Sequence, residues 1–202
     1  ESYTKTDLIV PVPDSGVPAA IGYSENVNKN IELGIIRNHY VGRTFIEPTQ
    51  KIRSLGVKLK HSINKTLIKN KTLTLIDDSL VRGTTSVKII KMLYEFGAKE
   101  VHLKIAAPPI KFPDYYGVDT PSKTELLASN LSIEGMRRFI GAKTLQFLSI
   151  EGLYKSLGFE KRNALYPQFT DHCFTGDYPI DPIDAKDESY REEKLSLMTS
   201  KI

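Results

Sequence analysis

The stretch from Leu73 to Ser86 constrains the fold more than any other part of this sequence. It opens with a short apolar run, Leu73 to Ile76, which is long enough for one buried strand. Two adjacent carboxylates, Asp77 and Asp78, come at the end of that strand, and a loop rich in hydroxyl groups follows them. Because a segment with helical apolar spacing comes next, we expect a strand, a loop and a helix within an α/β fold with a mostly parallel sheet.

The loop offers groups that bind a sugar phosphate. Ligands of open α/β sheets bind at the carboxyl ends of strands, and backbone N–H groups at a helix start can cradle a phosphate. Asp77 and Asp78 suit a vicinal diol or a hydrated divalent cation, and Gly83 lets the backbone come close because it has no Cβ atom. Two acids alone would equally suit a helix cap, but their register with the Arg-Gly-Thr-Thr run at residues 82–85 favours a site for a ribose 5-phosphate.

Composition indicates an ordinary globular domain. The chain has 202 residues, of which 40% are hydrophobic, and this is enough for one domain with a core. No apolar run approaches the roughly 18 residues that span a bilayer, and no secretory signal precedes the first strand, so we expect a cytoplasmic protein without a membrane partner. The net charge of +4 suits a polyphosphate substrate, and without a nucleic-acid motif we expect no nucleic-acid partner. The first residue is Glu1, so we expect the chain to start inside a larger protein.

The first half of the chain predicts two strands and a long connection. A strand is expected over residues 7–12 and a helix over residues 17–28, with Ser15 as its N-cap. A second strand is expected over residues 33–36. The polar and basic segment from Arg37 to the strand at Thr72, with a helix near residues 48–59, is either a solvated linker or a catalytic lid. The neighbouring phosphate motifs favour the lid.

The second half continues the alternation of strands and helices. Strands are expected over residues 101–107 and 145–149, and helices over residues 121–129, 132–141 and 150–157. Residues 167–179 read as irregular, and residues 181–202 as a charged tail. We therefore divide the chain into a catalytic domain, residues 1–160, and a C-terminal extension, residues 161–202.

Three motifs in order carry a resemblance to a known family. They are residues 10–16 (VPVPDSG), residues 37–45 (RNHYVGRTF) and the carboxylate motif at residues 77–86 (DDSLVRGTTS). The last resembles the signature for 5-phosphoribosyl 1-pyrophosphate (PRPP) in type I phosphoribosyltransferases. All three together resemble the amidophosphoribosyltransferases, also called glutamine PRPP amidotransferases, over about residues 7–179. The resemblance implies a type I phosphoribosyltransferase fold, with helices flanking a mostly parallel central sheet and with a flexible catalytic loop.

The resemblance also implies roles for residues. Asp77 and Asp78 would hold the ribose hydroxyls and, with Ser15, a Mg²⁺ ion. The pyrophosphate would face Asp14, Ser15 and Gly16. Tyr40, Arg43 and Lys60 would be catalytic residues of the loop that closes over PRPP. The 5-phosphate would be held by the loop and helix start that follow the carboxylates: Ser79, Val81, Arg82, Gly83, Thr84, Thr85 and Ser86.

The implied reaction is the first step of de novo purine synthesis. Ammonia would displace pyrophosphate at C1 of PRPP and give 5-phosphoribosylamine. The family's N-terminal glutaminase domain, whose first residue is a catalytic cysteine, is missing from these residues, and a homo-oligomer is expected. Some members hold an iron–sulfur cluster with four cysteines. Here Asp114 and Thr170 stand at two of those positions and Cys173 is the sole cysteine, so no cluster is expected.

Three alternatives remain at this point. The first is another phosphoribosyltransferase, such as a purine-salvage enzyme that uses a free base, although residues 37–45 argue against it. The second is a PRPP-binding regulator without activity, although the lid residues are present and no DNA-binding helix pair precedes the fold. The third is an inactive fragment.

Overall fold

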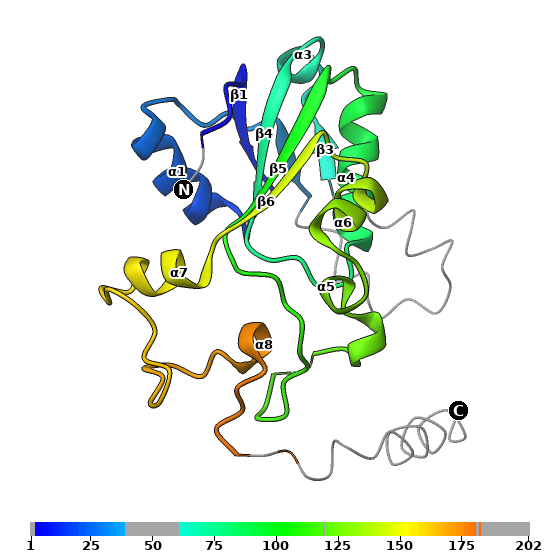
Figure 1. Ribbon diagram of the computed structural model, residues 1–202. Coiled ribbons are helices and arrows are strands. Elements are labelled where there is room, and N and C mark those ends of the chain that lie inside the picture. Colours follow the sequence, from blue (N-terminus) through cyan, green and yellow to red (C-terminus); the bar gives the residue numbers. More distant parts are fainter. Residues whose placement is uncertain (1–2, 39–60, 119, 181, 183–202) are drawn as a thin grey trace, which may run out of the picture.

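The centre of the structure is a four-stranded sheet whose neighbouring strands all run parallel. The structure is a computed structural model and describes residues 3–38, 61–118, 120–180 and 182. The strand order is β1-β4-β5-β6 (Figure 1). The strands are β1 (Leu8–Pro11), β4 (Thr72–Asp77), β5 (Glu100–Ile105) and β6 (Thr144–Phe147). The predicted α/β class with a mostly parallel sheet is confirmed.

Helices cover both faces of this sheet, which explains why β4 is an almost continuous run of buried residues. Helix α1 (Val17–Val27) packs on β1 and β4 on one face, whereas α4 (Thr84–Glu95) and α6 (Ile133–Ile140) lie on the other (Figure 1). The main core lies between the sheet and α4 and α6. Its fully buried side chains include Leu75, Leu93, Leu103 and Met136.

A short second sheet was not predicted in full. Strand β2 (Ile35–Arg37) pairs antiparallel with β3 (His61–Ile63), and a four-residue helix, α3 (Lys65–Ile68), follows. The sequence predicted a strand at residues 33–36 but no further strand before residue 72. Strand β3 was missed because its three residues, His-Ser-Ile, contain no apolar run. The helix expected near residues 48–59 lies outside the described residues.

Two further expectations need correction. The helix expected over residues 121–129 is a pair of short helices, η2 (Lys123–Glu125) and α5 (Leu127–Asn130), because the buried Leu126 between them is extended. The segment expected to be irregular at residues 167–179 contains a short helix, α8 (His172–Thr175). The helix expected over residues 150–157 is α7 (Ile150–Ser156). None of the helices in the described part of the chain is long and apolar enough to cross a membrane.

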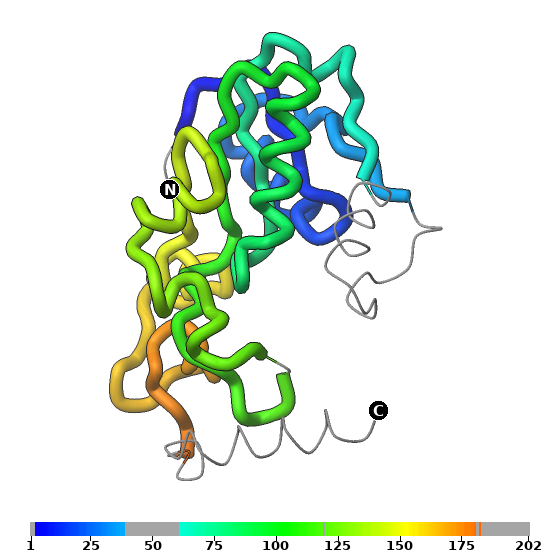
Figure 2. Tube along the Cα trace, turned by 90° about the vertical axis from the view of Figure 1, so that its right-hand side faces the viewer, coloured from blue at the N-terminus to red at the C-terminus, as the bar shows by residue number. Residues whose placement is uncertain are grey.

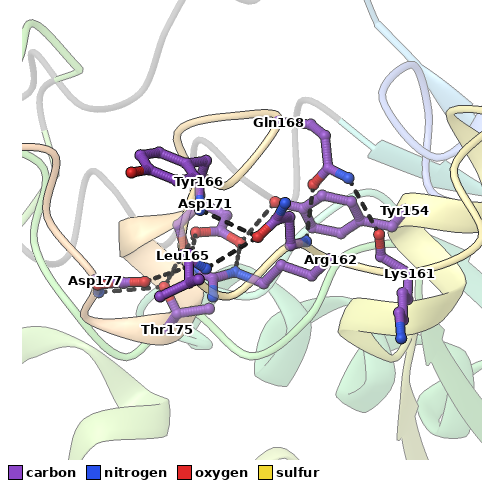
Figure 3. Close-up of polar contacts among 10 residues, drawn as sticks. Tyr154, Lys161, Arg162, Leu165, Tyr166, Gln168, Asp171, Thr175 and Asp177 are labelled. Carbon is purple, nitrogen blue, oxygen red and sulfur yellow. Dashed lines mark hydrogen bonds and ion pairs between the residues drawn. The ribbon is translucent and has the colours of Figure 1, made fainter.

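Beyond α7 the chain is held by a group of ion pairs centred on the buried Asp171 (Figure 3). The Asp171 carboxylate is 3% exposed and accepts hydrogen bonds from the Arg162 guanidinium at 2.5 and 3.1 Å and from the Tyr154 hydroxyl at 2.9 Å. Arg162 also pairs with Asp177 at 2.6 Å. Burial alone would raise the pKa of Asp171, but the bonds from Arg162 and Tyr154 outweigh it and lower that pKa below its ordinary value.

This ion-pair group joins the C-terminal segment to the rest of the molecule. Figure 2 shows the segment, yellow to orange, gathered beneath the sheet. Its helix α8 contacts the connection after β5, where the backbone N–H groups of Lys111 and Phe112 donate to the Cys173 carbonyl. The domain boundary expected near residue 160 remains a proposal, and the bond between Tyr154 and Asp171 crosses it.

We predict that Asp171→Ala lowers the free energy of unfolding by about 3–5 kcal/mol, because it leaves a largely buried guanidinium without its main partner. Urea denaturation followed by circular dichroism measures this loss. The control is Glu134→Ala, which breaks exposed pairs with Arg137 at 2.6 Å and Arg138 at 2.9 Å on α6 and should cost far less, because water screens exposed ion pairs. Equal losses in the two variants would contradict the prediction.

Candidate active site

The predicted site residues that the structure describes lie where β1 and β4 end. Strand β1 pairs with β4 in parallel, with Pro11 opposite Ile76, so both strands end at the same edge of the sheet. The turn after β1 carries Asp14, Ser15 and Gly16. The loop after β4 carries the carboxylate motif. Residues more than 60 positions apart in the sequence, such as Ser15 and Asp77, thereby come into contact.

Gly16 makes this close approach possible. A Cβ atom at residue 16 would lie 2.3 Å from the carbonyl oxygen of Ile76 and 3.1 Å from the Cα atom of Asp77. Any other residue would therefore push the start of α1 away from the end of β4. Gly16 is itself the N-cap of α1, so the prediction that Ser15 caps this helix is wrong. Ser15 lies one residue too early, and its hydroxyl donates to Asp77 Oδ1 at 3.3 Å instead.

The two carboxylates of the motif have different surroundings. Asp77 is 7% exposed at the end of β4, whereas Asp78 is exposed. Asp77 Oδ1 accepts hydrogen bonds from the Ser15 hydroxyl and from the Asp78 backbone N–H at 3.0 Å. Burial, and then the neighbouring Asp78 carboxylate, raises the pKa of Asp77 to about 7. A cation at this carboxylate would favour its charged form.

The loop after the carboxylates leads into a helix start that suits an anion. Gly83 has a φ of +74°, and a Cβ atom there would lie 2.7 Å from Leu127 Cδ2, so both conformation and space require glycine. Gly83 is the N-cap of the twelve-residue helix α4, and no described side chain caps that helix. Its first N–H groups are therefore left for an anion. Thr84 and Thr85 are exposed at this end, and Ser86 is buried.

Two ion pairs at the site were not predicted. Arg37 Nη1 pairs with Asp14 Oδ2 at 2.6 Å, and Arg82 Nη2 pairs with Glu125 Oε1 at 3.2 Å. The sequence placed Arg37 only at the start of a motif, and no pattern linked it with Asp14. No sequence pattern pointed to Glu125 as a site residue, because its partner Arg82 lies in another part of the chain. Three predicted catalytic residues lie outside the described residues: Tyr40, Arg43 and Lys60.

The donor atoms at the end of β4 fit Mg²⁺. Ser15, Asp77 and Asp78 offer only oxygen atoms, which are the ligands that this cation prefers. In the part of the chain that the structure describes, no three His, Cys, Asp or Glu side chains gather in a way that could hold a metal ion. A cation here would therefore take its remaining ligands from Ser15, from water or from the substrate.

The position expected to replace a cluster cysteine is engaged in another contact. A hydrogen bond of 2.6 Å joins Asp114 Oδ2 to His172 Nε2, and both side chains are largely buried. The ring of His172 stacks on Tyr178 with centroids 5.0 Å apart. Burial raises the pKa of the adjacent Cys173 thiol. These contacts pack the C-terminal segment against the connection after β5.

We predict that Asp77→Asn stabilises the protein in a pH-dependent way. Because the pKa of Asp77 is about 7 in the folded state and 3.8 ordinarily, the folded protein retains a proton that the unfolded chain loses, and wild-type stability falls as pH rises through this range. The variant cannot ionise there. Its advantage in the free energy of unfolding should grow between about pH 4 and pH 7 and then stay constant. Urea denaturation across this range measures it, and a difference that does not change with pH would contradict it.

Comparisons with known proteins find relatives among the amidophosphoribosyltransferases. No protein-family model matches it. The chain is 56% identical over 201 residues to the amidophosphoribosyltransferase of Rhizobium etli, covering 99% of this chain and 40% of that protein. It is 49% identical over 181 residues to the amidophosphoribosyltransferase of Bacillus subtilis, covering 90% and 38%. A relative in Arabidopsis thaliana, amidophosphoribosyltransferase 1, chloroplastic, is 51% identical over 186 residues, covering 92% and 32%.

Solved structures agree with this relationship. The glutamine PRPP amidotransferase of B. subtilis, complexed with ADP and GMP, superposes with a TM-score of 0.78 at 49% identity and covers 89% of this chain and 39% of that chain. The chain thus spans between 32% and 40% of the length of these relatives. At about half sequence identity and with the same fold, the chain is a homologue of a portion of the amidophosphoribosyltransferases.

Proposed function

We propose that the chain binds PRPP and transfers the nitrogen of ammonia to its C1, giving 5-phosphoribosylamine and pyrophosphate in the first step of de novo purine synthesis. The observation that carries this proposal is the contact at the end of the sheet. There the Ser15 hydroxyl lies 3.3 Å from the buried Asp77 carboxylate, next to the uncapped start of α4. Homology to amidophosphoribosyltransferases supports the same reaction.

The substrate would span the two turns at this edge. Asp77 and Asp78 accept hydrogen bonds from the ribose hydroxyls, because paired carboxylates suit a vicinal diol. The loop at residues 79–83 and the first N–H groups of α4 hold the 5-phosphate. The turn at residues 14–16 faces the pyrophosphate. This orientation places C1 between the phosphate loop and the turn after β1.

Mg²⁺ fits as the cofactor, and Ser15, Asp77 and Asp78 are the residues that would hold it. When bound, it supplies positive charge that offsets the charge of the leaving diphosphate. The raised pKa of Asp77 supports this assignment, because a buried carboxylate next to a second carboxylate is stabilised by a cation. We propose that no iron–sulfur cluster is bound, since Cys173 is the sole cysteine of the sequence.

The proposed reaction at C1 needs no strong general base from the protein, because neutral ammonia is already a nucleophile. Neutral ammonia attacks C1 with its lone pair, the bond from C1 to the pyrophosphate oxygen breaks, and the configuration at C1 inverts. The new C1–NH₃⁺ group then loses one proton to the released pyrophosphate or to water, which leaves the amine. We propose that three residues outside the described part of the chain act at this step: Tyr40, Arg43 and Lys60. The positive charges of Arg43 and Lys60 would stabilise the departing pyrophosphate. A closed loop would also keep water from hydrolysing PRPP.

We further propose that these 202 residues use free ammonia and that glutamine serves only when a glutaminase domain is joined to them. The chain matches only about two-fifths of the length of the R. etli and B. subtilis relatives, which supports a separate source of ammonia in the full-length enzymes. The Cys173 thiol is a poor candidate for a glutaminase nucleophile, because burial raises its pKa and so disfavours the reactive thiolate. A homo-oligomer and a cytoplasmic location remain proposals, and the Arabidopsis relative is named as chloroplastic.

The test is pyrophosphate release from PRPP and Mg²⁺, with ammonium chloride or glutamine in parallel reactions. We predict turnover with ammonium only. At fixed total ammonium the rate should rise with pH, since only the neutral form attacks C1, until the protein itself loses stability. Turnover with glutamine would contradict the proposed division. Binding of PRPP without turnover in ammonium would favour a regulator or an inactive fragment, and transfer to a free purine base would favour a salvage enzyme.

We predict that the Asp77→Asn, Asp78→Asn double variant binds PRPP with Mg²⁺ more weakly by about 1.5–3 kcal/mol, because charge-assisted hydrogen bonds to the ribose are lost. Isothermal titration calorimetry measures the affinity. Asp7→Asn and Asp177→Asn serve as matched controls, since both residues lie elsewhere in the fold. If the double variant bound PRPP as tightly as the wild-type protein, Asp77 and Asp78 would not be PRPP-binding residues.

A further inference from the structure

We propose that residues 123–130, which comprise η2 and α5, brace the phosphate loop at residues 79–83, and that the backbone N–H of Leu127 is the group that positions this loop. The inference rests on the proposed function, because it takes the loop as the place where a 5-phosphate binds. It adds a positioning residue about 45 positions further along the chain, outside every motif in the sequence.

The central contact is a backbone hydrogen bond. The N–H of Leu127 donates to the carbonyl oxygen of Val81 at 2.9 Å. Leu127 is the first residue of α5, and the first N–H groups of a helix have no partner within it, so this N–H is free to bond the loop. A single donor in a helix start thereby fixes one peptide group of the loop.

This bond also sets the direction of the next N–H group. The carbonyl of Val81 and the N–H of Arg82 belong to one trans peptide unit, in which they point in opposite directions. Holding the carbonyl toward Leu127 therefore turns the Arg82 N–H away from α5. A loop that binds a phosphate through its backbone needs its N–H groups turned to one side, and the Leu127 bond provides this orientation at Arg82.

Two side-chain contacts strengthen the brace. Leu127 Cδ2 lies against Gly83, within 2.7 Å of the place of a Cβ atom, and the Leu127 side chain is 9% exposed within the main core. Glu125 pairs with Arg82 at 3.2 Å. The loop is thus contacted at three successive residues, 81, 82 and 83, by a segment that is anchored in the core.

Asn130 holds the brace in shape. Its side-chain Nδ2 lies 3.2, 3.0 and 2.8 Å from the carbonyl oxygens of Lys123, Thr124 and Leu126. These bonds fold η2 onto α5 and keep Leu126 in the extended conformation that presents the next N–H to Val81. Asn130 is therefore a second positioning residue, acting through Leu127.

The experiment compares Leu127→Pro with Leu127→Ala. Both variants lose the leucine side chain, but only proline lacks the N–H. The backbone angles allow proline here, because Leu127 is the first helical residue and Leu126 before it has φ −74° and ψ 115°. The proline Cδ atom takes the place of the N–H hydrogen, so it also pushes the Val81 carbonyl out of its position 2.9 Å from this nitrogen. Calorimetry measures the affinity of the full chain for two probes: ribose 5-phosphate for the proposed phosphate loop, and pyrophosphate with Mg²⁺ for the turn after β1.

We expect Leu127→Pro to bind ribose 5-phosphate at least about fivefold more weakly than Leu127→Ala, because the proline variant loses the hydrogen bond and displaces the Val81 carbonyl that the bond holds. Pyrophosphate should bind both variants within about twofold of the wild-type affinity, because the contacts of Leu127 are with the loop at residues 81–83 and with the main core. Equal affinities of the two variants for ribose 5-phosphate would overturn the role of the N–H. The same conclusion would follow if Leu127→Pro lost affinity for ribose 5-phosphate and for pyrophosphate by the same factor. A wild-type protein that binds neither ligand would overturn the proposed function as well.

A second variant keeps the test decisive if the proline variant does not fold. Asn130→Asp places a carboxylate among three carbonyl oxygens and should weaken ribose 5-phosphate binding by about threefold or more without affecting pyrophosphate. Gln168→Glu is its matched control, since the Gln168 amide donates to the Lys161 carbonyl in a loop away from the site (Figure 3). Equal behaviour of Asn130→Asp and Gln168→Glu toward ribose 5-phosphate would overturn the role of the brace.

Discussion

The parallel pairing of β1 with β4 is the constraint on which the rest of the site depends. With Leu8 opposite Leu73 and Pro11 opposite Ile76, the chain leaves both strands at the same edge and at nearly the same height. The turn after β1 then packs onto the last residues of β4, and Gly16 leaves no side chain in the way of the Ile76 carbonyl. Without this contact Ser15 would not reach Asp77, and the two halves of the proposed PRPP site would not share one surface.

Two buried carboxylates of this fold have opposite pKa shifts because their surroundings differ. Asp171 is paired with Arg162 and bonded by Tyr154, and its pKa is lowered. Asp77 is nearly as buried, but its bonds come from a hydroxyl and a backbone N–H, and a second carboxylate lies beside it, so its pKa is raised. Because ionisation of Asp77 is unfavourable in the folded state, this carboxylate lowers the free energy of unfolding at neutral pH. A bound cation would stabilise the ionised carboxylate and raise that free energy again.

The site also depends on segments that come later in the chain. The loop at residues 79–83 has little regular structure of its own, and its geometry is fixed by contacts from η2 and α5. These short helices hold their shape through Asn130 and through the buried Leu126. A short loop can thus be held in place when a neighbouring segment anchored in the core supplies a hydrogen bond and an ion pair to it.

The sequence by itself determined the α/β class, the carboxylates at the end of β4 and the glycine before α4, because these depend on local apolar runs, turn chemistry and a short motif. It did not predict β3, the break at Leu126 or the partners of Asp14 and Arg82. Only the tertiary structure decided that Ser15 bonds Asp77 rather than capping α1, since that choice follows from how closely Gly16 approaches β4. Such contacts join residues far apart in the chain, and their geometry is set by strand pairing and packing, which local patterns do not encode.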